Sequence, residues 1–278
     1  MTNIARAALT LAFLLVLIIP SPTTRAQQIY QVYLPAIYYD HGSDPRYVVW
    51  RGPVAEVKSV GLRQQNTALD CCACAECSNQ WVWDCDSAAR FAAKHSGKLY
   101  IIGDEPDQHN QNPADYLDWY NECYALIKSA DPTARVAMAG IAQPNPRPCT
   151  WGHGLEYLGA LWEASGGKLQ TDQLRVHAFA APGGLDDWKR YIESWFTWRD
   201  QHMPDTPLAL GTFGYPGSLE ASPQVLRDTR AALGWLESIG LEQWYWWQWK
   251  ASDNEHNGLW DGEKLTKVGE IWVQWARR

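Results

Sequence analysis

Positive charge is scarce in this sequence, and long apolar runs are nearly absent. The 278 residues include 24 Lys and Arg against 31 Asp and Glu, which gives a formal net charge of −7. Because nucleic-acid binding needs clustered basic residues to neutralise phosphates, we expect no nucleic-acid partner. The one long apolar run covers residues 7–19, and these 13 residues are too few for a bilayer that needs about 20. We therefore expect no membrane span.

The first 26 residues have the pattern of a secretory signal peptide. Arg6 precedes the apolar run, and a polar stretch from Ser21 to Ala26 follows it. Without Arg6 and Arg25, 22 basic residues remain against 31 acidic ones, a formal charge of −9 that suits neutral substrates. We predict a signal peptide at 1–26, a leader or spacer at 27–46, and a folded domain at 47–278 in a secreted, extracellular protein.

The cysteines are concentrated in one stretch, residues 71–85. In an oxidising compartment this density favours a disulfide-pinned loop. A metal site is the runner-up, since the spacing of Cys72, Cys74 and Cys77 resembles that of metal ligands, but no matching pair follows at zinc-finger distance. We predict no metal and no cofactor. Which cysteines pair with one another stays open, as does whether the odd cysteine is unpaired or bonded to another chain. The seven cysteines are Cys71, Cys72, Cys74, Cys77, Cys85, Cys123 and Cys149.

Tryptophan is the compositional outlier, with 17 of the 278 residues. One interpretation is a large aromatic core, and the other is a set of flat platforms for the C–H faces of sugar rings. Composition favours the core for most of them, and the two interpretations are compatible.

Short apolar strands alternate with amphipathic helices from residue 87 onward, which predicts a parallel sheet covered by helices on both faces. The size matches a (β/α)8 TIM-type barrel of about 250 residues. A doubly wound sheet is the alternative, but no Gly-rich phosphate loop follows any strand. Residues 27–96 are too few for three full units, so we expect the first half to be abbreviated or irregular. The predicted strands are 98–103, 135–141, 173–179, 207–213 and 243–249, and the predicted helices are 87–95, 113–130, 155–164, 185–202, 223–238 and 264–275.

In such a barrel the site lies at the carboxyl ends of the strands. Glu105 follows the 98–103 strand beside Pro106, where apolar surroundings would raise its pKa and let it protonate a leaving oxygen. The alternative is that Glu105 has no catalytic role and either caps a helix or is an ordinary surface acid. The other candidates at strand ends are Asp104, Asp107, Gln143, Asn145, His177, Thr212, Tyr215, Gln248, Trp249, Asp253 and Glu255.

Residues 102–107 read Ile-Gly-Asp-Glu-Pro-Asp. This segment resembles the Ile-Gly-Asn-Glu-Pro-Asp strand of the clan of retaining glycoside hydrolases with (β/α)8 barrels, in particular secreted bacterial proteins of the glycosyl hydrolase catalytic core type. The resemblance covers roughly residues 87–278 and includes residues 131–136, the strand with His177 and residues 244–247.

The resemblance implies a carbohydrate partner and a role for each matching residue. Glu105 would be the general acid/base, and Asp104 replaces the Asn that holds the sugar 2-hydroxyl. His177 would belong to a His-x-Tyr element, although a hydrogen-bonded core histidine fits as well. The tryptophans of the last strand would floor the sugar pocket. The predicted substrate-binding residues are Asp104, His177, Thr212, Tyr215, Trp247 and Trp249.

One departure from the family pattern concerns the nucleophile. The family has Thr-Glu-Phe-Gly where residues 211–214 read Gly-Thr-Phe-Gly, which places Thr212 at the nucleophile position. A threonine hydroxyl lacks the negative charge and the labile ester of a carboxylate, so the retaining route should fail. Glu220 is the best candidate for a second carboxylate, ahead of Asp253 and Glu255.

Asp104 could instead act as the base of an inverting reaction, with carboxyl groups about 6.5–9.5 Å apart. Adjacent strand residues face opposite ways, so Asp104 and Glu105 would pair poorly unless the strand has already ended. Two hypotheses therefore stay open: a secreted glycoside hydrolase with Glu105 as proton donor, and a catalytically inactive carbohydrate-binding relative.

Overall fold

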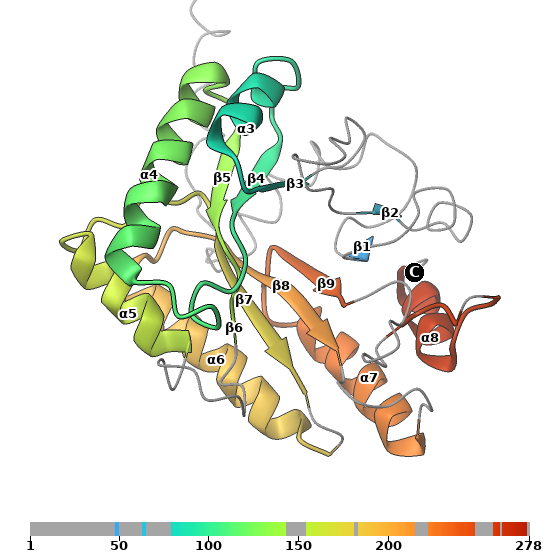
Figure 1. Cartoon of the computed structure of the whole chain (residues 1–278). Helices are drawn as coiled ribbons and strands as arrows, with labels where there is room; N and C mark the ends of the chain where they lie inside the picture. The colour runs from blue at the N-terminus through green and yellow to red at the C-terminus, as the bar shows by residue number, and fades with distance from the viewer. Residues whose placement is uncertain are drawn as a thin grey trace, which may run out of the picture. The chain divides into compact units, whose positions relative to one another are not determined.

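Parallel strands alternate with helices through the described part of the chain (Figure 1). The computed structural model describes residues 48–49, 63–64, 79–142, 154–180, 183–214, 222–247, 258–261 and 263–276, all within the compact unit 42–278. The predicted signal peptide, the spacer and cysteines 71–77 lie outside these ranges. The elements are β1 Val48–Val49, β2 Arg63–Gln64, β3 Asn79–Val82, α3 Cys85–Ala92, β4 Leu99–Ile102, α4 Pro113–Ala130, β5 Arg135–Met138, β6 Ile141–Ala142, α5 Gly154–Ala164, β7 Leu174–Phe179, α6 Leu185–His202, β8 Leu208–Gly214, α7 Pro223–Leu236, β9 Gln243–Trp246 and α8 Lys267–Ala276.

The strand order follows that of a (β/α)8 barrel. One sheet has the order β2-β1-β9-β8-β7-β6 and the other β3-β4-β5, and every pairing within them is parallel. The last strand, β9, pairs with the first, β1, as closure of a barrel requires. Among the described residues no ladder joins β2 to β3. The structure thus supports a TIM-like α/β fold without showing a closed barrel.

The strand predicted over residues 135–141 is two strands. β5 belongs to the three-stranded sheet, whereas β6, which follows after two intervening residues, pairs with β7 of the other sheet. An isolated parallel bridge between Ala137 and Gln173 also links β5 to the residue before β7. The chain therefore passes from one sheet to the other at residues 139–140.

A polar layer fills the space between the sheets at the amino ends of their strands. Asn79 Nδ2 donates to Tyr245 Oη at 2.9 Å, which joins β3 to β9 although these strands are not neighbours. Inward-pointing side chains of the strands form the interior layers of a (β/α)8 barrel, and this layer is one of that kind. Its members come from β3, β5, β7 and β9 or the residues just before them, namely Asn79, Arg135, Gln173, Arg175, Glu242 and Tyr245.

Hydrogen bonds hold the Arg135–Glu242 ion pair of this layer. Arg135 meets both carboxylate oxygens of Glu242, at 2.6 and 2.8 Å, and Gln173 donates to the same carboxylate at 2.7 Å. The guanidinium of Arg175 lies 5.2 Å from the centre of the Tyr245 ring, a cation–π contact. Burial raises the pKa of Tyr245 to about 12, so its hydroxyl stays neutral.

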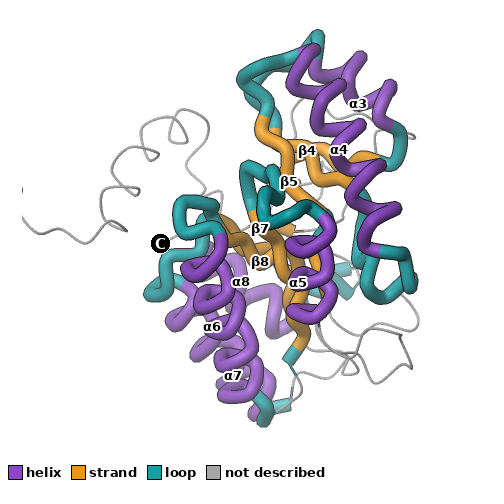
Figure 2. The backbone as a smooth tube through the Cα atoms, turned by 90° about the vertical axis from the view of Figure 1, so that its left-hand side faces the viewer, coloured by secondary structure: helices purple, strands orange, loops and turns teal. Residues whose placement is uncertain are grey.

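Helices α4 and α6 have the predicted bounds, and strong local signals mark the start of α4. Pro113 occupies the first turn of α4, and the side chain of Asn112 accepts the Ala114 amide at 2.9 Å. In Figure 2 the helices α5, α6 and α7 lie against one side of β7 and β8. None of the helices in the described ranges has both the length and the apolarity to cross a bilayer.

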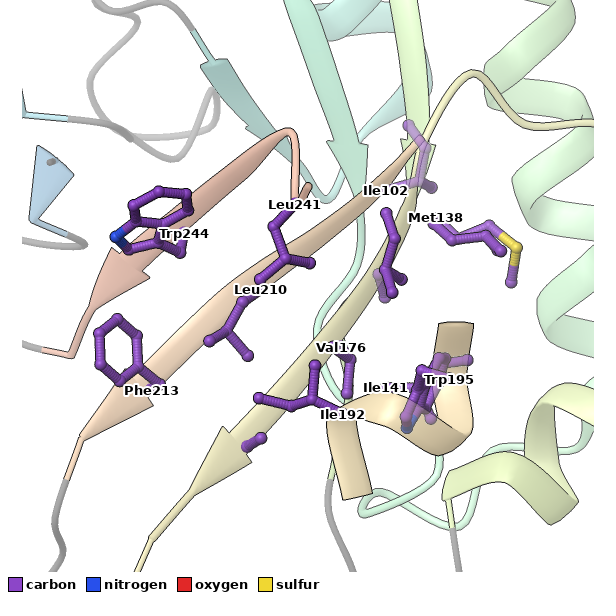
Figure 3. Packing of buried hydrophobic residues seen from close by; sticks show 14 of the residues in the cluster. Ile102, Met138, Ile141, Val176, Ile192, Trp195, Leu210, Phe213, Leu241 and Trp244 are labelled. Carbon is purple, nitrogen blue, oxygen red and sulfur yellow. The ribbon is translucent and has the colours of Figure 1, made fainter. Parts of the chain in front are cut away.

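Most of the described tryptophans belong to the core between strands and helices. Figure 3 shows Ile192 and Trp195 of α6 near Val176 of β7, with Phe213 and Trp244 farther along the same cluster. Indole rings supply much of the buried apolar surface. The core interpretation of the tryptophan excess is confirmed for the fully buried Trp188, Trp195, Trp244, Trp246 and Trp272.

A disulfide joins Cys85 at the start of α3 to Cys123 in α4. Both cysteines are buried. α3 begins at Cys85, two residues before the predicted start of this helix at residue 87, because Asp84 caps it by accepting the Ser87 amide at 2.7 Å. Cys85 pairs with a cysteine outside the stretch 71–85.

We predict that loss of this disulfide destabilises the α3–α4 pair. The bond closes a loop with a sequence separation of 38, and a loop of that length limits the unfolded chain enough to stabilise the fold by about 2–4 kcal/mol. Urea unfolding of the Cys85→Ala/Cys123→Ala double variant should show this loss relative to the oxidised parent. An unchanged unfolding midpoint would contradict the prediction.

Candidate active site

The turn after β4 carries Asp104 and Glu105. β4 ends at Ile102, and the backbone then takes positive φ values of 78° at Gly103 and 40° at Glu105. A non-glycine residue in this region is strained and often marks a functional site. Because the strand has already ended, its face alternation no longer separates the two acids. From the sequence we expect Asp104 and Glu105 to pair only if the strand ends before them, and in the structure it does.

The backbone of this turn is tied to both neighbouring strands. The Gly103 amide donates to Val82 O at 2.9 Å, and the indole N–H of Trp81 donates to Gly103 O. The Glu105 amide donates to Gly140 O at 3.1 Å, just beyond β5. These bonds fix the backbone that carries Glu105 before any ligand binds.

Both acids face the imidazole of His177 on β7. The Nδ1 atom lies 2.8 Å from Glu105 Oε1 and 3.9 Å from Asp104 Oδ1. The His177 side chain is 3% exposed, whereas those of Asp104 and Glu105 are 26% and 29% exposed. His177 is thus a buried histidine that holds Glu105, and the carboxylates lie between it and solvent.

His177 fits because the connection between β5 and β6 and the strand β8 each present a glycine to its ring. A Cβ atom at Gly140 would lie 1.9 Å from His177 Nε2, and one at Gly211 would lie 2.8 Å from the same atom. Neither separation is possible between real atoms, so no other residue fits at either position while the ring stays in place. We call Gly140 and Gly211 the glycine seat of His177.

Thr212 lies beside His177 in the sheet and is 2% exposed. The register of β7 and β8 shifts between Val176 and His177, and a second irregularity falls between Leu210 and Phe213 of β8. Such bulges redirect side chains and are common beside active sites. β8 contains no carboxylate side chain.

Asp104 and Glu105 approach the same nitrogen of His177. Their oxygens lie 3.9 and 2.8 Å from Nδ1, so these two oxygens are separated by at most the sum of those distances, which reaches only the lower end of the ~6.5–9.5 Å of an inverting pair. The alternative role of Asp104 as the base of an inverting reaction stays a prediction.

Asp107 anchors the far end of the turn and is 1% exposed. Its carboxylate accepts the Ala142 amide of β6 at 3.1 Å and the Gln108 side chain at 3.2 Å. Burial raises the pKa of Asp107, and the charge of Glu105 adds a smaller contribution in the same direction. This acid links the turn to β6 and is closed to solvent.

Trp247 packs against an apolar cluster on the inner face of the strands. The cluster consists of Trp81, Leu99, Ile101 and Ala137, and Trp247 is partly buried against it. Trp247 therefore lies on the opposite side of the sheet from Trp244 and Trp246. Trp81 was missed by sequence reasoning, although its alternation with Trp83 was a signal for a strand.

Several predicted site residues lie outside the described ranges, so their positions stay predictions. Within the described stretches no group of three or more His, Cys, Asp or Glu side chains has the arrangement of a metal site. The candidates outside these ranges are Gln143, Asn145, Tyr215, Glu220, Gln248, Trp249, Asp253 and Glu255.

Solved structures with a similar fold are β-1,3-glucanases. A GH128 subgroup III curdlan-specific exo-β-1,3-glucanase from Blastomyces gilchristii, in complex with glucose, is 20% identical over 83% of this chain and 99% of its own, with a TM-score of 0.64. A GH128 subgroup I endo-β-1,3-glucanase from Amycolatopsis mediterranei, in complex with laminaritriose, is 16% identical over 82% and 96%, with a TM-score of 0.58.

A third similar structure is a GH128 subgroup II endo-β-1,3-glucanase from Sorangium cellulosum, 18% identical over 78% of this chain and 82% of its own, with a TM-score of 0.55. No protein-family model and no curated protein sequence matches this chain. At these identities the likeness shows the fold: the chain has a glycoside hydrolase-like α/β fold.

We predict that Gly140→Ala disrupts the glycine seat. The added methyl group overlaps the His177 ring, so the free energy of unfolding should fall by about 1–3 kcal/mol or more. Gly159→Ala in α5 is the matched control, since its methyl group would meet nothing within 4 Å and should stabilise the helix by about 0.5–1 kcal/mol. If Gly140→Ala and Gly159→Ala unfold at the same midpoint, the prediction that position 140 needs glycine beside His177 is contradicted.

We predict that Asp107→Asn is more stable than the parent near neutral pH. The amide oxygen still accepts the Ala142 amide, and the buried charge is gone. Because burial raises the pKa of Asp107, its protonated form favours folding, and that contribution is lost as the pH rises through the folded pKa. The advantage of the variant should therefore shrink as the pH falls from about 7 to about 4.

Urea unfolding at both pH values measures the Asp107 effect. Asp107→Ala is the control, since it leaves the Ala142 amide without its acceptor and should lose about 1–3 kcal/mol. If Asp107→Asn loses as much as Asp107→Ala at neutral pH, the ionised carboxylate itself is required.

Proposed function

We propose that this protein acts on a β-1,3-linked glucan or a related polysaccharide, with Glu105 as general acid/base. The supporting observation is the Glu105–His177 pair: a partly exposed carboxylate at the carboxyl end of β4 is held at 2.8 Å by a buried imidazole. The solved β-1,3-glucanases with this fold bind glucose and laminaritriose, which favours a glucan as the ligand.

In the proposed reaction Glu105 protonates the glycosidic oxygen while the bond from that oxygen to the anomeric carbon breaks. The electron pair of that bond stays on the leaving oxygen. Water supplies the hydroxyl of the new reducing end, and its proton returns to Glu105. The imidazole of His177 orients the carboxyl group and shares a proton with it across the 2.8 Å contact.

The second carboxylate of the proposed reaction is Glu220. It follows Thr212 by eight residues, in the segment after β8, the strand that carries the nucleophile in the resembling family. Asp104 and Tyr215 would contact sugar hydroxyls. Trp247 and Trp249 would floor the pocket, since an indole presents a flat apolar face with a polar edge.

A second candidate function is carbohydrate binding without turnover. The observation in its favour is Thr212, which is buried beside His177 at the position where the resembling family has its nucleophile. A neutral hydroxyl there cannot stabilise an oxocarbenium-like centre as a carboxylate does.

We also infer export from the cell. The predicted signal peptide is one reason, and the Cys85–Cys123 disulfide is the other, because such bonds persist in oxidising compartments.

Binding and reducing-end release on laminarin, curdlan and an unrelated glycan panel test the proposed function. We expect Glu105→Gln to lower release by at least about 100-fold, since a general acid contributes about 10²–10⁴ in rate, while binding is kept. Glu163→Gln, an exposed acid on α5, is the matched control and should behave as the parent.

The possible outcomes separate the candidates. Release that survives Glu105→Gln would remove Glu105 from the mechanism. Binding without release by the parent would favour the second candidate, and release by Thr212→Glu would then show that the cleft still aligns a sugar. A parent that neither binds nor cleaves any glucan would contradict the proposal.

A further inference from the structure

Trp83 is the single large apolar side chain that is exposed in the described part of the chain. Trp83 is 46% exposed, whereas each of the fully buried tryptophans of the core is less than 2% exposed. Scattered exposed apolar residues need no explanation, but Trp83 is continuous with other indoles. Its ring centre lies 5.8 Å from that of Trp81, and Trp81 packs in the cluster that Trp247 covers.

The backbone places Trp83 next to the turn that carries Glu105. β3 pairs with β4 so that Val82 faces Ile102, and the Gly103 amide extends this ladder to Val82 O. Trp83 is therefore the first residue after β3, just as Gly103 is the first residue after β4. Neighbouring strands lie about 4.8 Å apart, so one strand spacing separates the backbone of Trp83 from that turn.

The contact with Trp81 places Trp83 beside the inner face of the strands. Asn79 reaches Tyr245 across the interior, and Trp81 packs on Leu99 and Ile101 of the inner cluster. Trp83 follows the end of β3, and its ring centre lies 5.8 Å from that of Trp81. The indole of Trp83 thus continues the inner aromatic surface to the carboxyl end of β3, where it is exposed.

Trp83 also lies on a rigid backbone. The β3–β4 ladder holds the residues before it. Asp84 caps α3 directly after it, and Cys85 is covalently bonded to Cys123 of α4. An exposed aromatic group that is fixed in this way loses little entropy when a ligand covers it, which is typical of a binding site.

From this placement we propose that Trp83 is a stacking platform for a pyranose unit beyond the two that are joined by the glycosidic oxygen at Glu105. The inference rests on the proposed glucan ligand and adds a subsite on the β3 side of Glu105. The exposed indole offers an apolar face to the C–H face of a sugar, and the rings of Trp81 and Trp83 are tilted by 31°. A long oligosaccharide reaches this platform, and a disaccharide at Glu105 does not fill it.

Calorimetric titration of the full chain with laminarihexaose and with laminaribiose tests the platform. We expect Trp83→Ala to weaken binding of the hexaose by about tenfold, as for truncation of a binding anchor, and to leave binding of the biose within about twofold. Trp83→Tyr keeps a flat ring and should stay within about threefold of the parent for both sugars. Thermal unfolding should be nearly unchanged, because the side chain is half-exposed.

Trp162→Ala is the matched control for the loss of one tryptophan. Trp162 lies on α5 against Trp198 and His202 of α6, and the variant should bind both sugars as the parent does. If the parent and Trp83→Ala bind the hexaose equally well, the proposed role of Trp83 is contradicted, whereas the proposed function is not. An equal loss in Trp162→Ala would also overturn it. A parent that binds neither sugar would overturn both inferences.

Discussion

The contact between Glu105 and His177 is the interaction on which the site depends. It joins the turn after β4 to β7, two strands that belong to different sheets. The imidazole can approach the turn because Gly140 and Gly211 leave room for its ring. The glycines, the bulge in β8 and the positive φ of Glu105 are thus parts of one arrangement that directs a carboxylate toward solvent.

The interior below this contact is ordered in layers. Asn79, Arg175 and Tyr245 belong to a polar layer near the amino ends of the strands, and the cluster around Trp81 covers it. Above them lie the acids of the turn. This succession of filled layers with a functional face at the carboxyl ends is the rule for (β/α)8 barrels. It explains why His177 is buried while its partner Glu105 is partly exposed.

Local signals in the sequence were enough to predict α4 and α6 and the position of Glu105 at a strand end. Capping residues and apolar periodicity are properties of short segments and can be recognised in one chain. The glycine seat could not be predicted, because it depends on which glycines elsewhere in the chain lie against His177. The cysteine-rich pattern also hid β3, and with it Trp81 and Trp83. The Cys85–Cys123 pairing likewise depends on how two helices pack.

The most direct test of the central claim is a crystal structure of Glu105→Gln soaked with laminarihexaose. The account predicts a glycosidic oxygen within hydrogen-bond distance of the side chain at position 105, with the imidazole of His177 still in contact with that side chain. A sugar bound away from the carboxyl ends of the strands, or a side chain at 105 turned away from both His177 and the sugar, would contradict it.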